Sequence, residues 1–366
     1  MDFYLPTRLY SGTNCISRHQ DAIKALGNRC MLVIDPLAAK ASGALGDVEG
    51  VLAANGIESF VWDGVAENPS VESCIEAGRL ASQKGAEFVI GVGGGSALDA
   101  AKAASVFLAN PELDEDGFYS LAWINDPAPI ALVGTTAGTG SEVTKVSVLT
   151  DANRRKHSIH DDRLYAAVSF GDSRHTHTCP ASVTLSCGVD VLAHAIESYF
   201  SRKADPISRA YSIQAVRLAW GPLEVTCSGK ELDAAMREQL YDASILGGMA
   251  INTTGTCFPH NVGYYLTENY GVPHGFASAI FLPALLACVN SFDREYASEF
   301  YDAVAADPEA IARVVESCLP DLDIRMTPEE IALAVPRWHN NGSVMNTRAE
   351  VSAETIHELL LSMFAH

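Results

Sequence analysis

The sequence predicts an α/β protein in two parts, an N-terminal domain built on a parallel sheet and a C-terminal domain made only of helices. Over about the first 175 residues, short runs of β-branched and other apolar residues alternate with helical stretches. After about residue 180 the chain consists of long Ala-, Leu- and Glu-rich stretches with little clustering of β-branched residues. Alternating strands and helices are typical of a parallel sheet with helices on its faces. We place the domains at residues 1–178 and 179–366.

Five short apolar runs are the predicted strands of this sheet. They cover residues 30–34, 59–62, 88–92, 129–133 and 166–170. Helices are predicted in the first domain over residues 36–55, 70–84 and 96–109, and in the second over 185–201, 206–218, 231–251 and 328–338. Ligands of parallel sheets bind beyond the carboxyl ends of the strands, so the segments that follow strands are the first candidates for a binding site.

The composition excludes several classes of partner. The 366 residues include 25 Lys and Arg against 45 Asp and Glu, a formal net charge of −20. A chain this acidic repels phosphate backbones and anionic lipids at long range, so we expect no nucleic-acid partner and no membrane partner. The longest apolar run, residues 279–289, is too short to span a bilayer.

The nine cysteines are scattered and contain no C-x-x-C pair. This spacing argues against a zinc ribbon or a disulfide framework and favours reduced thiols. The N-terminal segment also has no apolar core of the kind that a signal peptide needs. These features together favour a cytoplasmic protein.

A glycine-rich segment, residues 91–96, follows a predicted strand and opens a predicted helix. Glycines let the backbone approach a pyrophosphate, and a helix N-terminus supplies free N–H groups with positive potential. The match to G-x-G-x-x-G is incomplete, because Ser96 replaces the last glycine and no acidic residue follows about 20 residues later. The segment therefore predicts either phosphate binding or a plain strand-to-helix turn. Asp35, which follows an earlier strand, could hold the ribose of an adenosine or act as a turn or cap residue.

A second loop at the same sheet edge, residues 135–142, combines hydroxyl groups with glycines. Alone it would be a polar loop, but two such loops at one edge favour a nucleotide site. Its candidate donors are Thr135, Thr136, Thr139 and Ser141. Lys156 either adds a positive charge near a phosphate or belongs to a solvated basic turn.

The helical domain contains a possible metal site. Asp190 and His194 are four residues apart within a helical apolar pattern, so their side chains project from one face and can chelate a cation or form an ordinary ion pair. His260 and His274 follow later in the chain. One Asp and three His are a suitable set for Fe²⁺ or Zn²⁺. Spacing alone does not bring the last two histidines to the first two residues. Glu197, one turn beyond His194, either orients a ligand or is a surface acid.

These segments together resemble the iron-containing alcohol dehydrogenase family (group III), within the wider dehydroquinate synthase-like fold. The resemblance covers essentially the whole chain. It rests on Gly93-Gly94-Gly95-Ser96-x-x-Asp99-x-x-Lys102, on Thr135 to Glu142, on Gly188-x-Asp190-x-x-x-His194-x-x-Glu197, and on His260 with Pro273-His274-Gly275.

The resemblance implies a nucleotide-binding α/β domain, a helical metal-binding domain and an active site in the cleft between them. It implies a divalent metal, usually Fe²⁺ with Zn²⁺ as the alternative, held by Asp190, His194, His260 and His274. It also implies NAD(P)-linked interconversion of a small primary alcohol and its aldehyde. A homodimer or higher homo-oligomer is the common state of the family.

The implied cofactor contacts lie in the first domain. They are Asp35, Asn68, Gly94, Gly95, Ser96, Asp99, Thr135, Thr136, Thr139, Ser141 and Lys156. The carboxylate of Asp35 would repel a 2′-phosphate and no Arg stands beside it, so we favour NAD over NADP.

One position departs from the family pattern. Many members have a second histidine four residues after the third ligand, and here that residue is Tyr264. The candidate catalytic residues are therefore His274 and Tyr264, with the proton moving through water, the ribose hydroxyls or the phenol.

Alternative readings use the same fold. A polyol dehydrogenase of the glycerol type is the nearest. A metal-free reductase would not need the full Asp and His set, and a cyclase would need more basic residues near the histidines. A non-catalytic nucleotide-binding or metal-storage protein would not need both the glycine loop and the four-ligand site.

Overall fold

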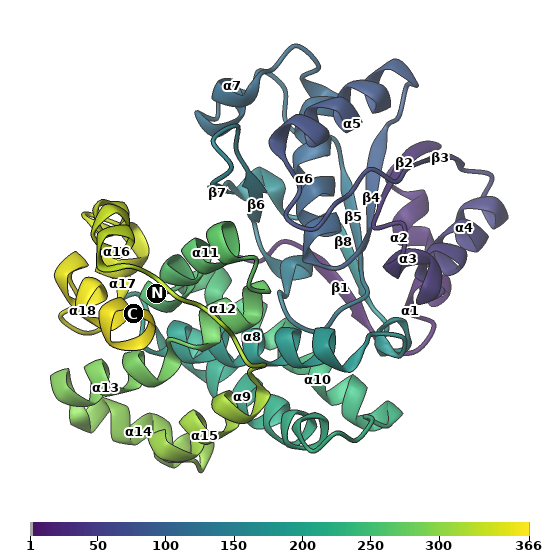
Figure 1. Cartoon of the computed structure of the whole chain (residues 1–366). Helices are drawn as coiled ribbons and strands as arrows, with labels where there is room; N and C mark the ends of the chain where they lie inside the picture. Colours follow the sequence, from purple (N-terminus) through teal and green to yellow (C-terminus); the bar gives the residue numbers. More distant parts are fainter. Residues whose placement is uncertain (1–2, 366) are drawn as a thin grey trace. The chain divides into compact units, whose positions relative to one another are not determined.

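The computed structural model describes residues 3–365, which form two compact units (Figure 1). The sheet unit contains Tyr4–Pro180 together with Asp233–Tyr241. The helical unit contains Ala181–Leu232 and the chain from Asp242 onward. Asp233 and the beginning of the long helix α10 (Ala234–Thr254), up to Tyr241, thus belong to the sheet unit.

A parallel sheet forms the centre of the sheet unit, as expected, and it has six strands where five were predicted. Its order is β1 (Arg8–Ser11), β8 (Val168–Gly171), β5 (Ile130–Gly134), β4 (Phe88–Gly93), β2 (Arg29–Ile34) and β3 (Glu58–Trp62). All five neighbouring pairs are parallel. Strand β1 was not predicted, because its four residues, RLYS, have no continuous apolar run.

Two layers of helices cover this sheet. On one face α1 (Cys15–Arg18), α2 (Gln20–Lys24), α3 (Ala38–Ala41) and α4 (Ala44–Ala54) form a core with Leu32 and Ile34 of β2. On the other face α5 (Val71–Gln83), α6 (Gly95–Ala109) and α7 (Glu115–Tyr119) pack with Met31 and Val33 of the same strand. Successive strand residues point to opposite faces, which explains the two separate cores.

The stretch 36–55 is two helices and not the single helix that was predicted. Helix α3 ends before Ser42 and α4 begins after Gly43, whose φ of 80° lies in the left-handed region. Glycine adopts this conformation without a steric penalty, so the chain turns there. An antiparallel hairpin, β6 (Val146–Thr150) and β7 (Lys156–His160), was also not predicted.

The helical unit has no strand among its described residues. Its helices are α8 (Ala181–Tyr199), α9 (Pro206–Cys227), α10 (Ala234–Thr254, whose start belongs to the sheet unit), α11 (Phe258–Tyr270), α12 (His274–Ala279), α13 (Leu282–Phe292), α14 (Arg294–Val304), α15 (Pro308–Cys318), α16 (Pro328–Ala334), α17 (Gly342–Asn346) and α18 (Ala353–Phe364). Short 3₁₀ helices also occur in the chain, among them η1 (Ser141–Val143), η2 (Asp162–Leu164), η3 (Ser173–Thr176) and η4 (Val335–Trp338). The α/β-plus-helical fold class is thereby confirmed.

Two of the nine cysteines are paired, which corrects the expectation of reduced thiols throughout. Cys227 at the end of α9 and Cys318 at the end of α15 form a disulfide, with their Cα atoms 5.5 Å apart. The two residues are 91 positions apart, so only the packing of α9 against α15 brings them together. The other seven cysteines form no disulfide among the described residues.

One segment of the helical unit, His274–Phe292, is long and apolar enough to cross a membrane by length and composition. It consists of α12 and α13, and more than half of it is buried inside the structure. Buried core helices of soluble proteins give the same signal. We therefore regard this segment as part of the core of the helical unit.

Candidate metal centre and dinucleotide loops

Three helices of the helical unit bring one carboxylate and three imidazoles together. Asp190 and His194 lie one turn apart on α8, His260 lies in the first turn of α11, and His274 is the first residue of α12. The Nε2 atoms of His260, His194 and His274 lie 3.4, 3.7 and 3.9 Å from Oδ1 of Asp190. The structure therefore gathers the four residues that the sequence could not bring together by spacing.

Two glycines allow these helices to approach so closely. A Cβ atom at Gly275, next to His274, would meet the carbonyl oxygen of Ser186 on α8. A Cβ atom at Gly263 of α11 would lie 2.6 Å from the carbonyl oxygen of Ala277 on α12. Only glycine fits at these two backbone contacts, which set the distance of α12 from α8 and from α11.

Glu197 holds one of the imidazoles. It is fully buried, and its Oε1 lies 2.5 Å from Nδ1 of His260. Its Oε2 accepts a hydrogen bond of 2.7 Å from the backbone N–H of Cys257, at the start of α11. A carboxylate on Nδ1 fixes the orientation of the ring and directs Nε2 toward Asp190. Of the two interpretations of Glu197, the structure supports ligand orientation and contradicts a surface position.

The charges within this cluster shift the pKa values of its members. Burial by itself would raise the pKa of Asp190, but His194, His274 and His260 hold it well below its usual value. Burial disfavours the imidazolium form of His260, yet Glu197 and Asp190 outweigh it and raise the pKa of His260 to about 10. The two carboxylates therefore favour positive charge at Nε2 of His260, whether a proton or a metal ion supplies it.

The donor set fits a divalent metal. Oδ1 of Asp190 and Nε2 of His260 are buried and make no hydrogen bond to any described residue. Asp190, His260 and His274 each offer a ligand atom, and these atoms lie within 4.8 Å of one another. Imidazoles combined with one carboxylate suit Fe²⁺ and Zn²⁺. Buried polar atoms that make no hydrogen bond are costly, and a cation between these two would satisfy both.

Tyr264 lies beside the ligand set. It follows His260 by one turn of α11, and its ring stacks on that of His274 at 5.5 Å between centroids. The side chain of His274 is 26% exposed, whereas those of Asp190 and His260 are 3% exposed or less. The cluster is therefore reached from the side of His274.

In the sheet unit the glycine segment packs directly on the second loop. Gly94 and Gly95 join β4 to the start of α6. A Cβ atom at Gly95 would lie 2.6 Å from Cγ2 of Thr139, and one at Gly94 would lie 3.2 Å from Cγ2 of Thr136. The glycines thus make room for the threonines of the second loop, which places backbone N–H groups and hydroxyls side by side.

The other predicted cofactor residues lie around these two loops. The N–H of Asn68, which has a φ of 55°, points at Oγ of Ser96 at 3.4 Å. Thr135 is buried, and its Oγ1 has no hydrogen-bond partner among the described residues. Lys156, on β7, is close enough for its charge to act on the pKa of Asp99.

Asp35 acts as a cap in the structure. Its Oδ1 accepts hydrogen bonds from the N–H groups of Leu37 and Ala38, at 2.9 and 3.0 Å, at the start of α3. This is one of the two roles expected for an acid at the end of a strand.

Asp99 and Ser141 belong to a buried polar group behind the loops. Oγ of Ser141 donates a hydrogen bond of 2.6 Å to Oδ1 of Asp99, and the N–H of Val148 donates one of 2.9 Å to Oδ2. The ammonium of Lys102 lies 2.7 Å from the same Ser141 hydroxyl. Burial raises the pKa of Asp99 and lowers that of Lys102, and the charge of each opposes the shift of the other.

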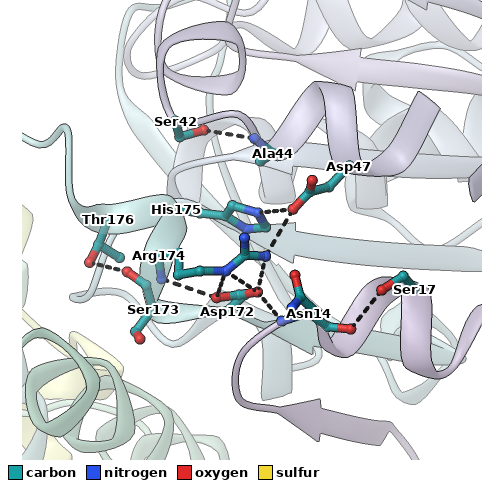
Figure 2. A network of polar contacts seen from close by, with 10 residues as sticks. All are labelled: Asn14, Ser17, Ser42, Ala44, Asp47, Asp172, Ser173, Arg174, His175 and Thr176. Atoms are coloured by element: carbon teal, nitrogen blue, oxygen red, sulfur yellow. Dashed lines mark hydrogen bonds and ion pairs between the residues drawn. The ribbon is translucent and has the colours of Figure 1, made fainter. Parts of the chain in front are cut away.

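A second group of potential metal ligands lies at the end of β8 and on α4 (Figure 2). Nε2 of His175 is 3.0 Å from Oδ2 of Asp47. The guanidinium of Arg174 bonds Asp172 at 2.6 Å and Asp47 at 3.1 Å, so it lies between the two carboxylates (Figure 2). Because this guanidinium already pairs with both carboxylates, we interpret the group as a structural ion-pair network and not as a metal site.

Comparisons with known proteins identify the family. The family model described as "Iron-containing alcohol dehydrogenase" matches residues 6–173, and that of the "Fe-containing alcohol dehydrogenase family, C-terminal" matches residues 184–360. The chain belongs to the iron-containing alcohol dehydrogenase family. It is therefore an oxidoreductase with the fold that the sequence motifs predicted.

Two named relatives are similar over much of the chain. The sulfoacetaldehyde reductase of Bilophila wadsworthia is 35% identical over 76% of this chain and 72% of its own length. The NADPH-dependent butanol dehydrogenase of Clostridium saccharobutylicum is 31% identical over 95% of this chain and 91% of its own length.

Solved structures of related proteins have the same fold. The alcohol dehydrogenase of Thermotoga maritima is 30% identical, covers 99% of this chain and 98% of its own, and has a TM-score of 0.91. The sulfoacetaldehyde reductase of Bifidobacterium kashiwanohense, in complex with NAD⁺, is 25% identical, covers 99% of this chain and 98% of its own, and has a TM-score of 0.87.

Two buried residues of the family fold had no assigned role from the sequence. Lys102 is the last residue of the glycine-loop motif, three residues after Asp99. The spacing of that motif does not predict that its side chain is buried. Glu142 ends the second loop, and its Oε1 accepts a hydrogen bond of 2.6 Å from the hydroxyl of Tyr241 on α10. The partner of Glu142 is 99 residues away, so no local signal indicates the pair.

Proposed function

We propose that this member of the iron-containing alcohol dehydrogenase family interconverts a small primary alcohol and its aldehyde, with NAD as the hydride carrier and a divalent metal held by Asp190, His194, His260 and His274. The approach of three Nε2 atoms to within 3.9 Å of one Asp190 oxygen carries this proposal. A metal bound there would act as a Lewis acid on the oxygen of the alcohol or aldehyde.

The protein's own residues provide position and proton handling. The Nε2 atoms of the three imidazoles lie around Oδ1 of Asp190, and Glu197 keeps Nε2 of His260 directed at that oxygen. The phenol of Tyr264 stacks on His274, at the exposed side of the cluster. We therefore propose that Tyr264 takes the place of the histidine that many relatives have here, and that its hydroxyl passes the substrate proton to water.

For the cofactor we propose that the two packed loops of the sheet unit bind the dinucleotide. The backbone N–H groups after Gly94 and the hydroxyls of Thr136 and Thr139 face the phosphates and ribose in this proposal. Relatives differ in the cofactor they are named for or solved with: the butanol dehydrogenase is NADPH-dependent, and the sulfoacetaldehyde reductase structure contains NAD⁺. We propose NAD, because a carboxylate at Asp35 would repel the 2′-phosphate of NADP.

The proposed metal is Fe²⁺. The ligand set accepts Zn²⁺ as well, so the choice in the cell depends on metal supply as well as on coordination. We further propose that the enzyme acts in the cytoplasm as a homodimer, as its family does commonly. The disulfide between Cys227 and Cys318 removes the argument from reduced thiols for the cytoplasmic location. Light scattering of the purified protein would test the dimer by giving twice the mass of one chain.

The proposal is tested by following NADH absorbance with a panel of small aldehydes, polyols and sulfonated aldehydes. We expect turnover of at least one unbranched aldehyde with NADH, and slower turnover with NADPH. The variant Asp35→Asn keeps the oxygen that caps α3 and removes its charge, so we expect the preference for NADH over NADPH to fall about tenfold. No turnover of any panel member by metal-loaded enzyme would contradict the proposed function, and an unchanged preference in the variant would contradict the role of Asp35.

A further inference from the structure

We propose that Lys102 is a positioning residue for the dinucleotide: its buried ammonium fixes the second loop, residues 135–142, at the place where that loop binds the cofactor. This inference rests on the proposed function, since it assigns a role in cofactor binding to a residue that the cofactor does not touch.

The ammonium of Lys102 is held from several sides. Its Nζ lies 2.8 Å from the carbonyl oxygen and 2.7 Å from the hydroxyl of Ser141, 3.2 Å from the hydroxyl of Thr144 and 2.7 Å from the carbonyl oxygen of Val146. The carboxylate of Asp99, one turn earlier on α6, is 3.7 Å away. Four of these five contacts belong to residues 141–146, which carry the end of the loop into β6.

The burial of this lysine calls for an explanation. Its side chain has no exposed surface, although moving an ammonium group out of water is costly. The cost is offset only by a full set of hydrogen bonds, and every acceptor here comes from Asp99 or from the segment 141–146. Since no surface of Lys102 is exposed, it does not contact a dinucleotide itself.

A short chain of contacts connects Lys102 to the cofactor loops. Lys102 holds Ser141, the N–H of Ser141 points at Oγ1 of Thr139 at 3.3 Å, and Thr139 packs against Gly95 at the start of α6. The same helix carries Lys102 and begins at Gly95. Lys102 therefore ties the second loop to the helix whose N-terminus would bind the pyrophosphate, and loss of this tie would displace Thr139 from Gly95.

This arrangement also assigns a role to Asp99 and Ser141. The carboxylate of Asp99 receives hydrogen bonds from Ser141 and Val148, and the Ser141 hydroxyl bonds both Asp99 and Lys102. In this inference their polar atoms hold the loop and do not bind the dinucleotide directly.

The test compares full-length, metal-loaded Lys102→Met with wild type. Methionine fills a similar volume but has no charge and no N–H group. We expect the Kd for NADH, measured by fluorescence titration, and the KM for NAD to rise about tenfold to a hundredfold. We expect kcat at saturating NAD and the affinity for the metal to change less than about twofold, because bound cofactor restores the loop and the metal ligands lie in the other unit. Amide hydrogen exchange of residues 135–146, measured without cofactor, should become faster.

Two further variants separate positioning from stability. Phe118→Leu removes volume from a buried aromatic cluster of the same unit that contains Phe107 and Trp123, and it serves as a control of lower stability that should keep the Kd for NADH of wild type. Thr144→Val removes one acceptor of Lys102 with little change in shape, so it should raise the Kd about threefold even if Lys102→Met fails to fold.

An unchanged Kd in folded Lys102→Met or in Thr144→Val would overturn the inference, as would an equal rise in Phe118→Leu. If wild type itself binds no NADH, the proposed function fails. In that case the amide exchange rates of residues 135–146, measured without cofactor, still test whether Lys102 fixes the loop. Equal rates in wild type and Lys102→Met would overturn this role.

Discussion

At the scale of single residues, the two carboxylates beside His260 determine which of its nitrogens faces the ligand position. His260 has Glu197 on Nδ1 and Asp190 near Nε2, so one nitrogen is fixed by a carboxylate and the other faces the ligand position. A carboxylate placed in this way also makes the imidazole a stronger ligand. Glu197 should therefore influence metal affinity without being a ligand.

We expect Glu197→Gln to weaken metal binding about tenfold to a hundredfold, because the amide cannot accept from both Nδ1 of His260 and the N–H of Cys257. Competition with a chelator of known affinity measures the change. Glu142→Gln is the matched control, since Glu142 is the buried glutamate that bonds Tyr241 in the sheet unit, and its metal affinity should equal that of wild type. Equal affinities of wild type and Glu197→Gln would show that Glu197 does not orient His260.

Part of this site could be predicted from residues alone. The spacing of Asp190 and His194 predicts a shared helix face, and the structure confirms that they lie together. The convergence of His260 and His274 depends on Gly263 and Gly275, where helices touch through their backbones. No periodicity in the sequence reports such contacts, so only the family resemblance indicated that these histidines join the site.

At the scale of elements, the network around Asp172 links the turn before α1, the helix α4 and the 3₁₀ helix η3. The N–H of Asn14 donates to Asp172, and Arg174 joins Asp172 to Asp47 of α4. Burial alone would raise the pKa of Asp172, but its bonds with Arg174 and with the N–H of Asn14 lower it below the usual value.

The lowered pKa of Asp172 predicts that the free energy of unfolding depends on pH. A carboxylate whose folded pKa lies below its unfolded value of about 3.9 stabilises the fold above that pH and loses the contribution as the pH falls through the folded pKa. We expect Asp172→Asn to reduce the free energy of unfolding by about 1–3 kcal/mol at pH 7. Urea unfolding of both proteins at pH 7 and in steps below pH 4 measures the difference, which should shrink as the pH falls. A difference that stays constant with pH would contradict this role of Asp172.

The sequence patterns predicted some of the helices and strands correctly and missed others. Five strands were predicted from short, largely apolar runs. Of these, β2, β4 and β5 are almost entirely buried, whereas β3 at the sheet edge has no buried residue. Strands β1, β6 and β7 lie at an edge or in a hairpin and mix polar with apolar residues, so they gave no such run. The break between α3 and α4 depends on one left-handed glycine, Gly43, within a stretch of otherwise helical composition.

At the scale of the whole molecule, the two kinds of chemistry lie in different units. The dinucleotide loops belong entirely to the sheet unit, and all four metal-ligand candidates belong to the helical unit. The proposed reaction needs both, because hydride passes between a cofactor and a substrate that are held by different parts of the chain. The fold class followed from the alternation of strands and helices before residue 180 and the helical stretches after it, and the division of roles followed from the positions of the motifs in the two halves. The disulfide and the packing of residues 233–241 with the sheet unit depend on contacts between distant segments and gave no sequence signal.

The central claim is that one acid and three imidazoles of the helical unit bind a single divalent ion. Crystals grown with Fe²⁺ without oxygen, and measured at the iron absorption edge, test it most directly. We predict one strong anomalous peak about 2.1 Å from Oδ1 of Asp190 and from the Nε2 atoms of His194, His260 and His274. Absence of that peak, or a peak at Asp47, Asp172 and His175 in its place, would contradict the account.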